Sequence, residues 1–184
     1  MKDSSGFTLI ELLVAIALIV VLASVLIPSS KALSRAHARR AAISIVMDSM
    51  EGAKRSAQVS KKNVWVIFRH TGGKKPDSLR VVTMDGISPV AQGTWLKLPE
   101  GIFFKVEDES LMGEPPPKNI LLAGLNGLLP LERESFGSLM FSGSGRILIP
   151  KPGGRSLKID FSSTIGPFPG SITISRGTGR TSYQ

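Results

Sequence analysis

The hydrophobic pattern of residues 1–60 differs from that of the rest of the chain. Residues 7–27 are almost all apolar, and Glu11 is the only charged side chain among them. A helix over this stretch would be roughly 31 Å long at about 1.5 Å per residue, and the hydrocarbon core of a bilayer is about 30 Å thick. The pattern therefore predicts a helix of membrane-spanning length.

Glu11 is the unusual residue of this stretch. A carboxylate near the centre of a bilayer costs about 2 to 3 kcal/mol or more, so it usually has a partner or a task. Two interpretations remain open from the residues alone. The side chain either reaches back to the headgroup zone and does nothing else, or it takes part in function.

Helical periodicity continues after Pro28, and no glycine interrupts it before Gly52. Apolar side chains recur at spacings of three, four or seven at Leu33, Ala36, Ile43, Met47, Met50 and Ala57. We therefore expect residues 29–60 to form an amphipathic helix that continues the apolar one to about Val59. Pro28 should bend the helix locally, because proline lacks a backbone N–H and crowds the preceding turn.

Residues 61–184 have the character of a β-rich domain, with 17 of the 19 glycines and 11 of the 12 prolines after residue 60. Short segments rich in β-branched and aromatic residues lie between turn residues, at 64–69, 79–84, 94–98, 102–107, 138–142, 146–149, 156–161 and 172–175. Gly143-Ser144-Gly145 indicates a tight hairpin. The spacing favours antiparallel sheets, and the predicted fold class is α+β, with the long helix packed on an antiparallel β head.

Two stretches of this head have no strand pattern. Met112 to Lys118 contains three consecutive prolines, which predict a stiff extended loop. The leucines between Ile120 and Glu134 could line either a short helix or a buried edge, and the glycines there argue against a long helix.

The chain is basic, with a net charge of +9, and it contains no cysteine. Without cysteine it has no disulfide and no thiolate metal site. From Arg146 onward six basic residues stand against one acid, Asp160. They are Arg146, Lys151, Arg155, Lys158, Arg176 and Arg180. This excess permits nucleic acid or anionic lipid as a partner without requiring either.

The sequence predicts neither an enzyme nor a metal or cofactor site. His37 and His70 are the only histidines, and each is better explained by a structural or solvated role than by catalysis. No zinc-protease, nucleophile-elbow or phosphate-loop motif is present. The acidic run at residues 107–109 lacks the alternating ligands and glycine of a calcium loop.

The N-terminus resembles the signature of type IV pilins and pseudopilins. A short polar leader, residues 1–6, ends in Gly6 and is followed by Phe-Thr-Leu-Ile-Glu and a further apolar run. The resemblance implies that a prepilin peptidase cuts between Gly6 and Phe7 and that the new amine of Phe7 is N-methylated. It also implies that residues 7–28 form the transmembrane and filament-core helix, and that Glu11 pairs with the terminal amine of a neighbouring subunit.

The C-terminal part resembles the general secretion pathway protein H family, which includes minor pilins related to fimbrial T proteins. The resemblance rests on a strand at Phe141, a Gly-Ser-Gly turn, further strands, and the segment from Ile172 to Arg180. It implies a bacterial minor pseudopilin of a type II secretion pseudopilus or a type IV pilus. Such a protein spans the inner membrane once through residues 7–27, with its head in the periplasm.

The partners implied are other pilin subunits, the prepilin peptidase, the inner-membrane assembly platform and membrane lipid. Bases that follow the span, at Lys31, Arg35, Arg39 and Arg40, would by themselves favour an inside C-terminus. The processing motif favours the opposite orientation, and long domains translocate largely regardless of charge. We therefore expect the periplasmic head.

Two alternatives to this function remain. Some fimbrial T proteins bind DNA through a Gly-Arg-x-Arg motif near the C-terminus, and Gly179-Arg180-Thr181-Ser182 supplies only its first arginine. The main alternative is thus a DNA-binding minor pilin used in natural transformation, with Arg176 and Arg180 as its candidate contacts. The other is a single-pass membrane protein that never assembles.

Overall fold

The computed structural model describes residues 8–73, 75–86, 88–105, 115–127, 130, 134–149, 156–164, 166–168 and 170–184, with only the backbone at 23–32 and 149. The predicted leader 1–6, Phe7, the acidic run 107–109, the first part of the loop that begins at Met112, and the bases Lys151 and Arg155 lie outside these residues. The chain divides into two compact units, residues 1–37 and 38–184.

Helix α1 (Leu9–Ser60) is the longest element, and both units contain a part of it. Its backbone stays helical through Pro28, where the predicted bend remains a prediction. The helix ends where Lys61 adopts a positive φ of 56°, close to the predicted end. Among the described residues, no helix is both long and apolar enough to cross a membrane. Part of the span predicted at 7–27 lies outside those residues.

The first sheet has five antiparallel strands in the order β3-β2-β1-β5-β6. They are β1 (Val64–His70), β2 (Ser78–Asp85), β3 (Ser88–Lys97), β5 (Ser135–Phe141) and β6 (Ile147–Ile149). In the central strand Val66 pairs with Val81 on one side and with Leu139 on the other. The hairpin predicted at residues 143–145 joins β5 to β6, and the backbone N–H of Ser142 donates to the carbonyl of Arg146 at 2.8 Å.

The second sheet has four antiparallel strands in the order β4-β7-β8-β9. They are β4 (Ile102–Phe104), β7 (Ser156–Ser163), β8 (Ser171–Ser175) and β9 (Thr181–Tyr183). The two sheets meet near β6, where the N–H of Ile147 donates to the carbonyl of Arg176 just after β8. Every strand pairing among the described residues is antiparallel, so the predicted α+β class with antiparallel sheets is confirmed.

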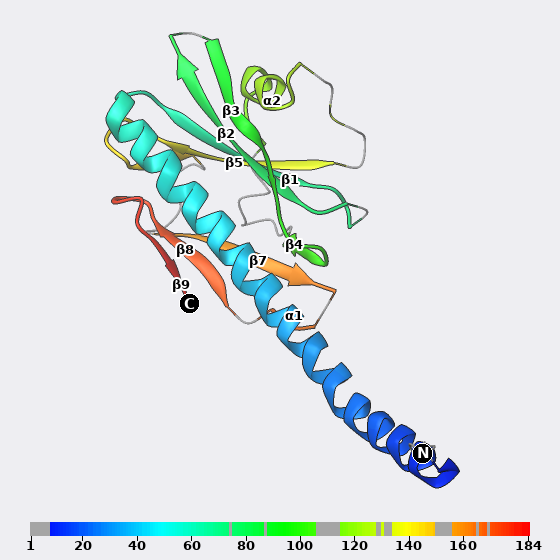
Figure 1. Cartoon of the computed structure of the whole chain (residues 1–184). Coiled ribbons are helices and arrows are strands. Elements are labelled where there is room, and N and C mark those ends of the chain that lie inside the picture. The colour runs from blue at the N-terminus through cyan, green and yellow to red at the C-terminus, as the bar shows by residue number, and fades with distance from the viewer. Residues whose placement is uncertain are drawn as a thin grey trace, which may run out of the picture. The chain divides into compact units, whose positions relative to one another are not determined.

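The main core lies between the C-terminal part of α1 and the two sheets (Figure 1). One stripe of α1 enters it, at Ala42, Val46, Met50, Ala53 and Ala57. The spacing of the apolar residues predicted for this helix was right, but some of the predicted residues do not lie on the buried face. Leu33 is exposed, and Ile43 and Met47 are only partly buried, because the sheets meet the helix face that starts at Ala42.

A second, smaller core lies on the opposite face of the first sheet, under helix α2 (Lys118–Gly124). Strand β1 serves both cores, since Val64, Val66 and Phe68 belong to the main core while Trp65 and Ile67 belong to the smaller one. This explains why β1 is apolar from Val64 to Phe68 instead of alternating. The open question at residues 120–134 is answered for its first part, which is helical.

Some elements differ from their predicted bounds. Strand β3 begins at Ser88, six residues before the predicted start at Thr94, and β9 was not predicted at all. The sequence of β3 contains Pro89 and Gly93, which are unfavourable in a strand. Both strands lie at sheet edges, where only one neighbouring strand pairs with them.

Candidate functional site

The N-terminus of α1 is fastened by a reciprocal pair of hydrogen bonds between Thr8 and Glu11. The Thr8 N–H and hydroxyl both donate to Glu11 Oε2 at 2.9 Å, and the Glu11 N–H donates to Thr8 Oγ1 at 3.3 Å. This is a capping box, in which a threonine at the N-cap and a glutamate three residues later satisfy each other's backbone donors. In the isolated chain, the Glu11 carboxylate therefore caps the N-terminus of α1.

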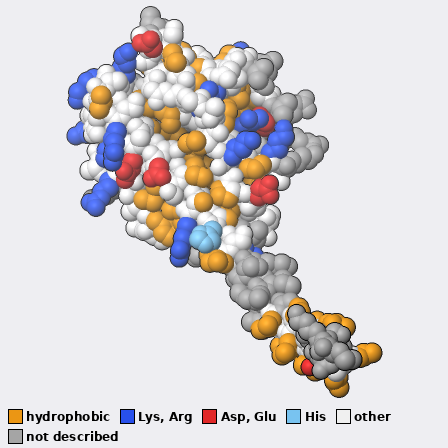
Figure 2. All heavy atoms as spheres, viewed as in Figure 1, with side chains coloured by type: hydrophobic (Ala, Val, Ile, Leu, Met, Phe, Trp, Pro, Cys, Tyr) orange, Lys and Arg blue, Asp and Glu red, His pale blue; other side chains and the backbone are white. Residues whose placement is uncertain are grey.

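Glu11 stands among exposed apolar side chains. Leu9 is 83% exposed, and large apolar residues remain exposed through Leu22. Figure 2 shows apolar side chains over the surface of this segment. A hollow of about 290 Å³ on one helix face is lined by Ile10, Glu11, Val14, Ala15 and Leu18. A continuous apolar surface of this kind is normally covered by lipid or by another chain.

The other predicted processing residues, Gly6 and Phe7, lie outside the described residues, so the cleavage site remains a prediction. Thr8 was missed by the sequence reasoning. Its spacing to Glu11, Thr-x-x-Glu before an apolar run, is a helix-start signal that the sequence carries. The signal gives Glu11 a local role that is separate from any role in assembly.

A polar pocket of about 220 Å³ lies between α1 and the turn that joins β8 to β9. Its lining consists of Glu51, Lys54, Arg55, Gln58, Gly179, Arg180 and Thr181. Arg55 Nη2 is 3.4 Å from Glu51 Oε2, one helical turn away. Tertiary structure thus brings Arg180 together with two bases of α1 that the sequence had not connected with it.

The four C-terminal bases that the structure describes do not share one environment. Arg176 does not line the polar pocket, and its side chain is only partly exposed. Lys158 Nζ is 3.1 Å from Asp160 Oδ1 on the same strand, and Arg146 is exposed. Of the two arginines predicted as DNA contacts, Arg180 alone lines the pocket.

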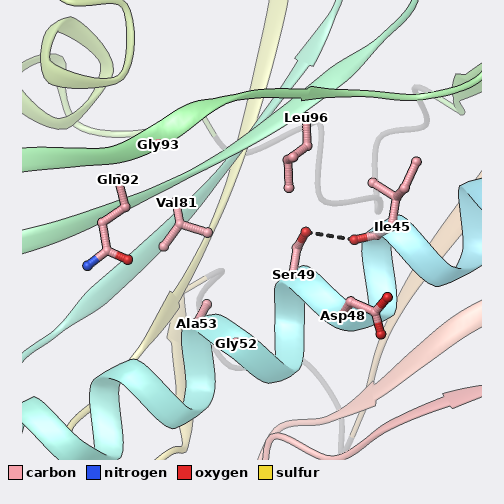
Figure 3. A pocket seen from close by; sticks show the side chains of 9 residues that line it. All are labelled: Ile45, Asp48, Ser49, Gly52, Ala53, Val81, Gln92, Gly93 and Leu96. Carbon is pink, nitrogen blue, oxygen red and sulfur yellow. Dashed lines mark hydrogen bonds between the residues drawn. The ribbon is translucent and has the colours of Figure 1, made fainter.

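An apolar groove of about 600 Å³ lies between α1 and strands β2 and β3. Figure 3 shows Leu96 and Ile45 along it, with the Ser49 hydroxyl turned to the Ile45 carbonyl, to which it donates at 2.6 Å. Asp48 is the only charged residue of the lining, which is Ile45, Asp48, Ser49, Gly52, Ala53, Val81, Gln92, Gly93 and Leu96. The neighbouring edge strand β3 carries Pro89 and a register shift opposite Arg80, features that discourage the addition of another strand.

His70, for which a structural or solvated role was predicted, contacts a buried carboxylate. Its Nδ1 is 2.8 Å from Oδ2 of Asp77, a carboxylate that is 0% exposed. The same carboxylate accepts hydrogen bonds from the N–H of Thr71 at 2.9 Å and from the N–H of Phe104 at 2.8 Å. Asp77 therefore ties the β1–β2 connection to β4 in the second sheet. Within the part of the chain that the structure describes, no group of three or more potential ligand side chains could hold a metal ion.

Comparison with curated proteins and with solved structures gives no match. A family model does match the N-terminus: residues 1–27 match the family described as the prokaryotic N-terminal methylation motif. The matched residues include the predicted cleavage site, Glu11 and the exposed apolar segment from Leu9 to Leu22. This motif supports a type IV pilin-like protein.

Proposed function

We propose that this chain is a minor pseudopilin, a structural subunit of a type II secretion pseudopilus or of a type IV pilus. A prepilin peptidase removes residues 1–6, and residues 7–27 hold the protein in the inner membrane with its head in the periplasm. The subunit then moves from the membrane into a helical filament. The methylation motif suggests a structural protein rather than an enzyme.

The observation that supports this proposal best is a single carboxylate, Glu11, on a helix segment that exposes apolar side chains from Leu9 to Leu22. Such a segment requires lipid or other chains around it. In either environment an unpaired carboxylate is costly, whereas two opposite charges that meet there offset each other's loss of hydration. The terminal amine of a processed neighbour would supply the opposite charge.

The capping box makes the role of Glu11 testable, because helix capping needs an acceptor and charge pairing needs a charge. Glu11→Gln keeps an acceptor that can cap the helix and removes the charge. We expect Glu11→Gln and Glu11→Ala to insert into the membrane at least as well as the native chain, and both to enter filaments poorly. Thr8→Ala removes the cap hydroxyl and keeps the charge, so it should assemble.

The measurement is the fraction of the protein found in sheared filaments, compared with the fraction left in the inner membrane. Normal assembly of Glu11→Gln would show that the pairing of Glu11 with a neighbour's amine is wrong. If Thr8→Ala failed to enter filaments while Glu11→Gln assembled normally, the function of Glu11 would be helix capping alone.

DNA capture through Arg176 and Arg180 remains the alternative function. The position of Arg180 beside Lys54 and Arg55 favours anion binding at that end of the head. Glu51 in the same lining opposes a polyanion. We therefore expect the protein to bind duplex DNA only in the non-specific range, with a Kd of about 10⁻⁴ to 10⁻⁶ M at physiological salt.

A further inference from the structure

We propose that the polar pocket lined by Lys54, Arg55, Gln58, Arg180 and Thr181 binds a carboxylate side chain of a neighbouring protein subunit. This inference rests on the proposed function, because a filament supplies the neighbour. It assigns the pocket a ligand class, an acidic side chain, and it places one contact between subunits on the head rather than on the apolar helix.

The first argument is charge. The lining contains three bases and one acid, and among the described residues the Glu51 carboxylate forms an ion pair only with Arg55. Lys54 and Arg180 have no acidic partner among the residues that the structure describes. Two cations that face one small cavity repel each other, and an anion between them relieves this repulsion. Charge-assisted hydrogen bonds from an ammonium and a guanidinium to a carboxylate are among the stronger polar contacts in proteins.

The second argument is an unsatisfied hydroxyl. Thr181 is 8% exposed and lines the pocket, and its Oγ1 is buried without a hydrogen-bond partner. A buried hydroxyl without a partner is costly, so native structures seldom retain one without a reason. A carboxylate in the pocket would give this hydroxyl an acceptor after a rotation of its side chain.

The third argument is the shape of the turn. Gly179 has a φ of +60°, and a Cβ on it would collide with the carbonyl oxygen of Gly145 and lie 3.3 Å from Cδ of Lys54. Glycine at this position allows the turn to lie close to α1, which brings Arg180 and Lys54 to one cavity. Close packing thus fixes the backbone on one side of the pocket, while the Arg55 and Glu51 side chains of the lining are 78% and 53% exposed.

A carboxylate fits this pocket better than a phosphate group of DNA. The lining carries a net charge of +2, three bases less one acid, and because the Arg55–Glu51 pair is neutral this charge lies on Lys54 and Arg180. A single carboxylate would neutralise half of it, and Glu51 would repel the neighbouring phosphates of a nucleic acid.

The test uses the isotope-labelled full-length chain in detergent micelles, with amide shifts of Thr181 and Arg180 as the readout. The probe is the peptide acetyl-Gly-Glu-Glu-Gly-amide, and its matched control is the same peptide with glutamine in place of glutamate. We expect the acidic peptide alone to move these signals. Arg180→Gln and Lys54→Gln should each weaken its binding about tenfold, the effect of one lost charge-assisted contact. Lys158→Gln, whose lysine pairs with Asp160 elsewhere, should leave binding unchanged.

Thr181→Val provides a second test that does not depend on the charged residues. Valine has nearly the same shape but no hydroxyl. We expect the free protein to become no less stable, because the hydroxyl has no partner to lose, while the acidic peptide binds several-fold more weakly. A clear loss of stability with unchanged peptide binding would assign Thr181 a purely structural role and overturn its place in the site.

Other outcomes would also overturn the proposal. The proposal fails if the acidic and glutamine peptides shift the amide signals equally. It also fails if inorganic phosphate or a DNA duplex binds more tightly than the acidic peptide. A preference for the duplex would instead favour the DNA-binding alternative. The proposed function fails separately: an uncut chain with an intact Met1 would refute the pilin role and leave the peptide result standing.

Discussion

Replacing Asp77 by alanine should lower the free energy of unfolding by about 2 to 6 kcal/mol. The carboxylate is 0% exposed and accepts three hydrogen bonds of 2.8 to 2.9 Å, from the Thr71 N–H, the Phe104 N–H and His70 Nδ1. Alanine leaves the two backbone donors without an acceptor, and each orphaned buried donor costs about 1 to 3 kcal/mol. The upper part of this range approaches the whole stability of a marginal domain.

Asp77→Asn has nearly the same shape and should cost about half as much, because its amide oxygen can still accept from one of the two backbone donors. Urea unfolding of the full-length protein in detergent, followed by tryptophan fluorescence, measures both changes. Trp65 is a suitable reporter because it is buried in the smaller core.

Asp85→Ala is the matched control for this experiment. Asp85 also forms an ion pair, with Lys62 at 2.9 Å, but its side chain is 77% exposed. Exposed pairs contribute about 0.2 to 1 kcal/mol, so this variant should remain close to the native protein. If Asp77→Ala were as mild as Asp85→Ala, the reasoning that Asp77 ties the two sheets together would be refuted.

Three further outcomes are expected. Gly52→Ala should stabilise the protein by about 0.5 to 1 kcal/mol in thermal unfolding, because a Cβ there meets nothing within 4 Å on a helix interior. Its control Gly179→Ala should destabilise it, since φ is +60°. Mass spectrometry of the membrane-extracted protein should find a methylated Phe7 at the N-terminus, and Gly6→Ala should block the cut, whereas cleavage after Ser24 would contradict the motif. A chain that begins at Ser30 should be soluble with β-rich circular dichroism, and a spectrum dominated by helix would contradict the β head.

The sequence alone was sufficient to predict the elements whose signal is local. The N-terminal helix is specified by neighbours within one turn of each other, including the Thr8-x-x-Glu11 start, which was present in the sequence but not used. Strands β1, β2 and β7 were predicted nearly to their bounds, because β-branched and aromatic runs between turn residues identify strands that sheets bury. The methylation motif at residues 1–27 is likewise a contiguous pattern.

Tertiary structure alone decided the features that depend on residues far apart in the chain. The edge strand β9 and the first half of β3 are strands because a neighbour pairs with them: β9 has only three residues, and the first half of β3 contains weak strand formers such as Ser88 and Pro89. The direction of the buried stripe on α1 depends on where the sheets meet the helix, which helical periodicity does not specify. The acceptor role of Asp77 and the meeting of Lys54 with Arg180 arise in the same way. Hydrogen bonds and charge contacts act over a few ångströms in space, and only the folded chain determines which residues come that close.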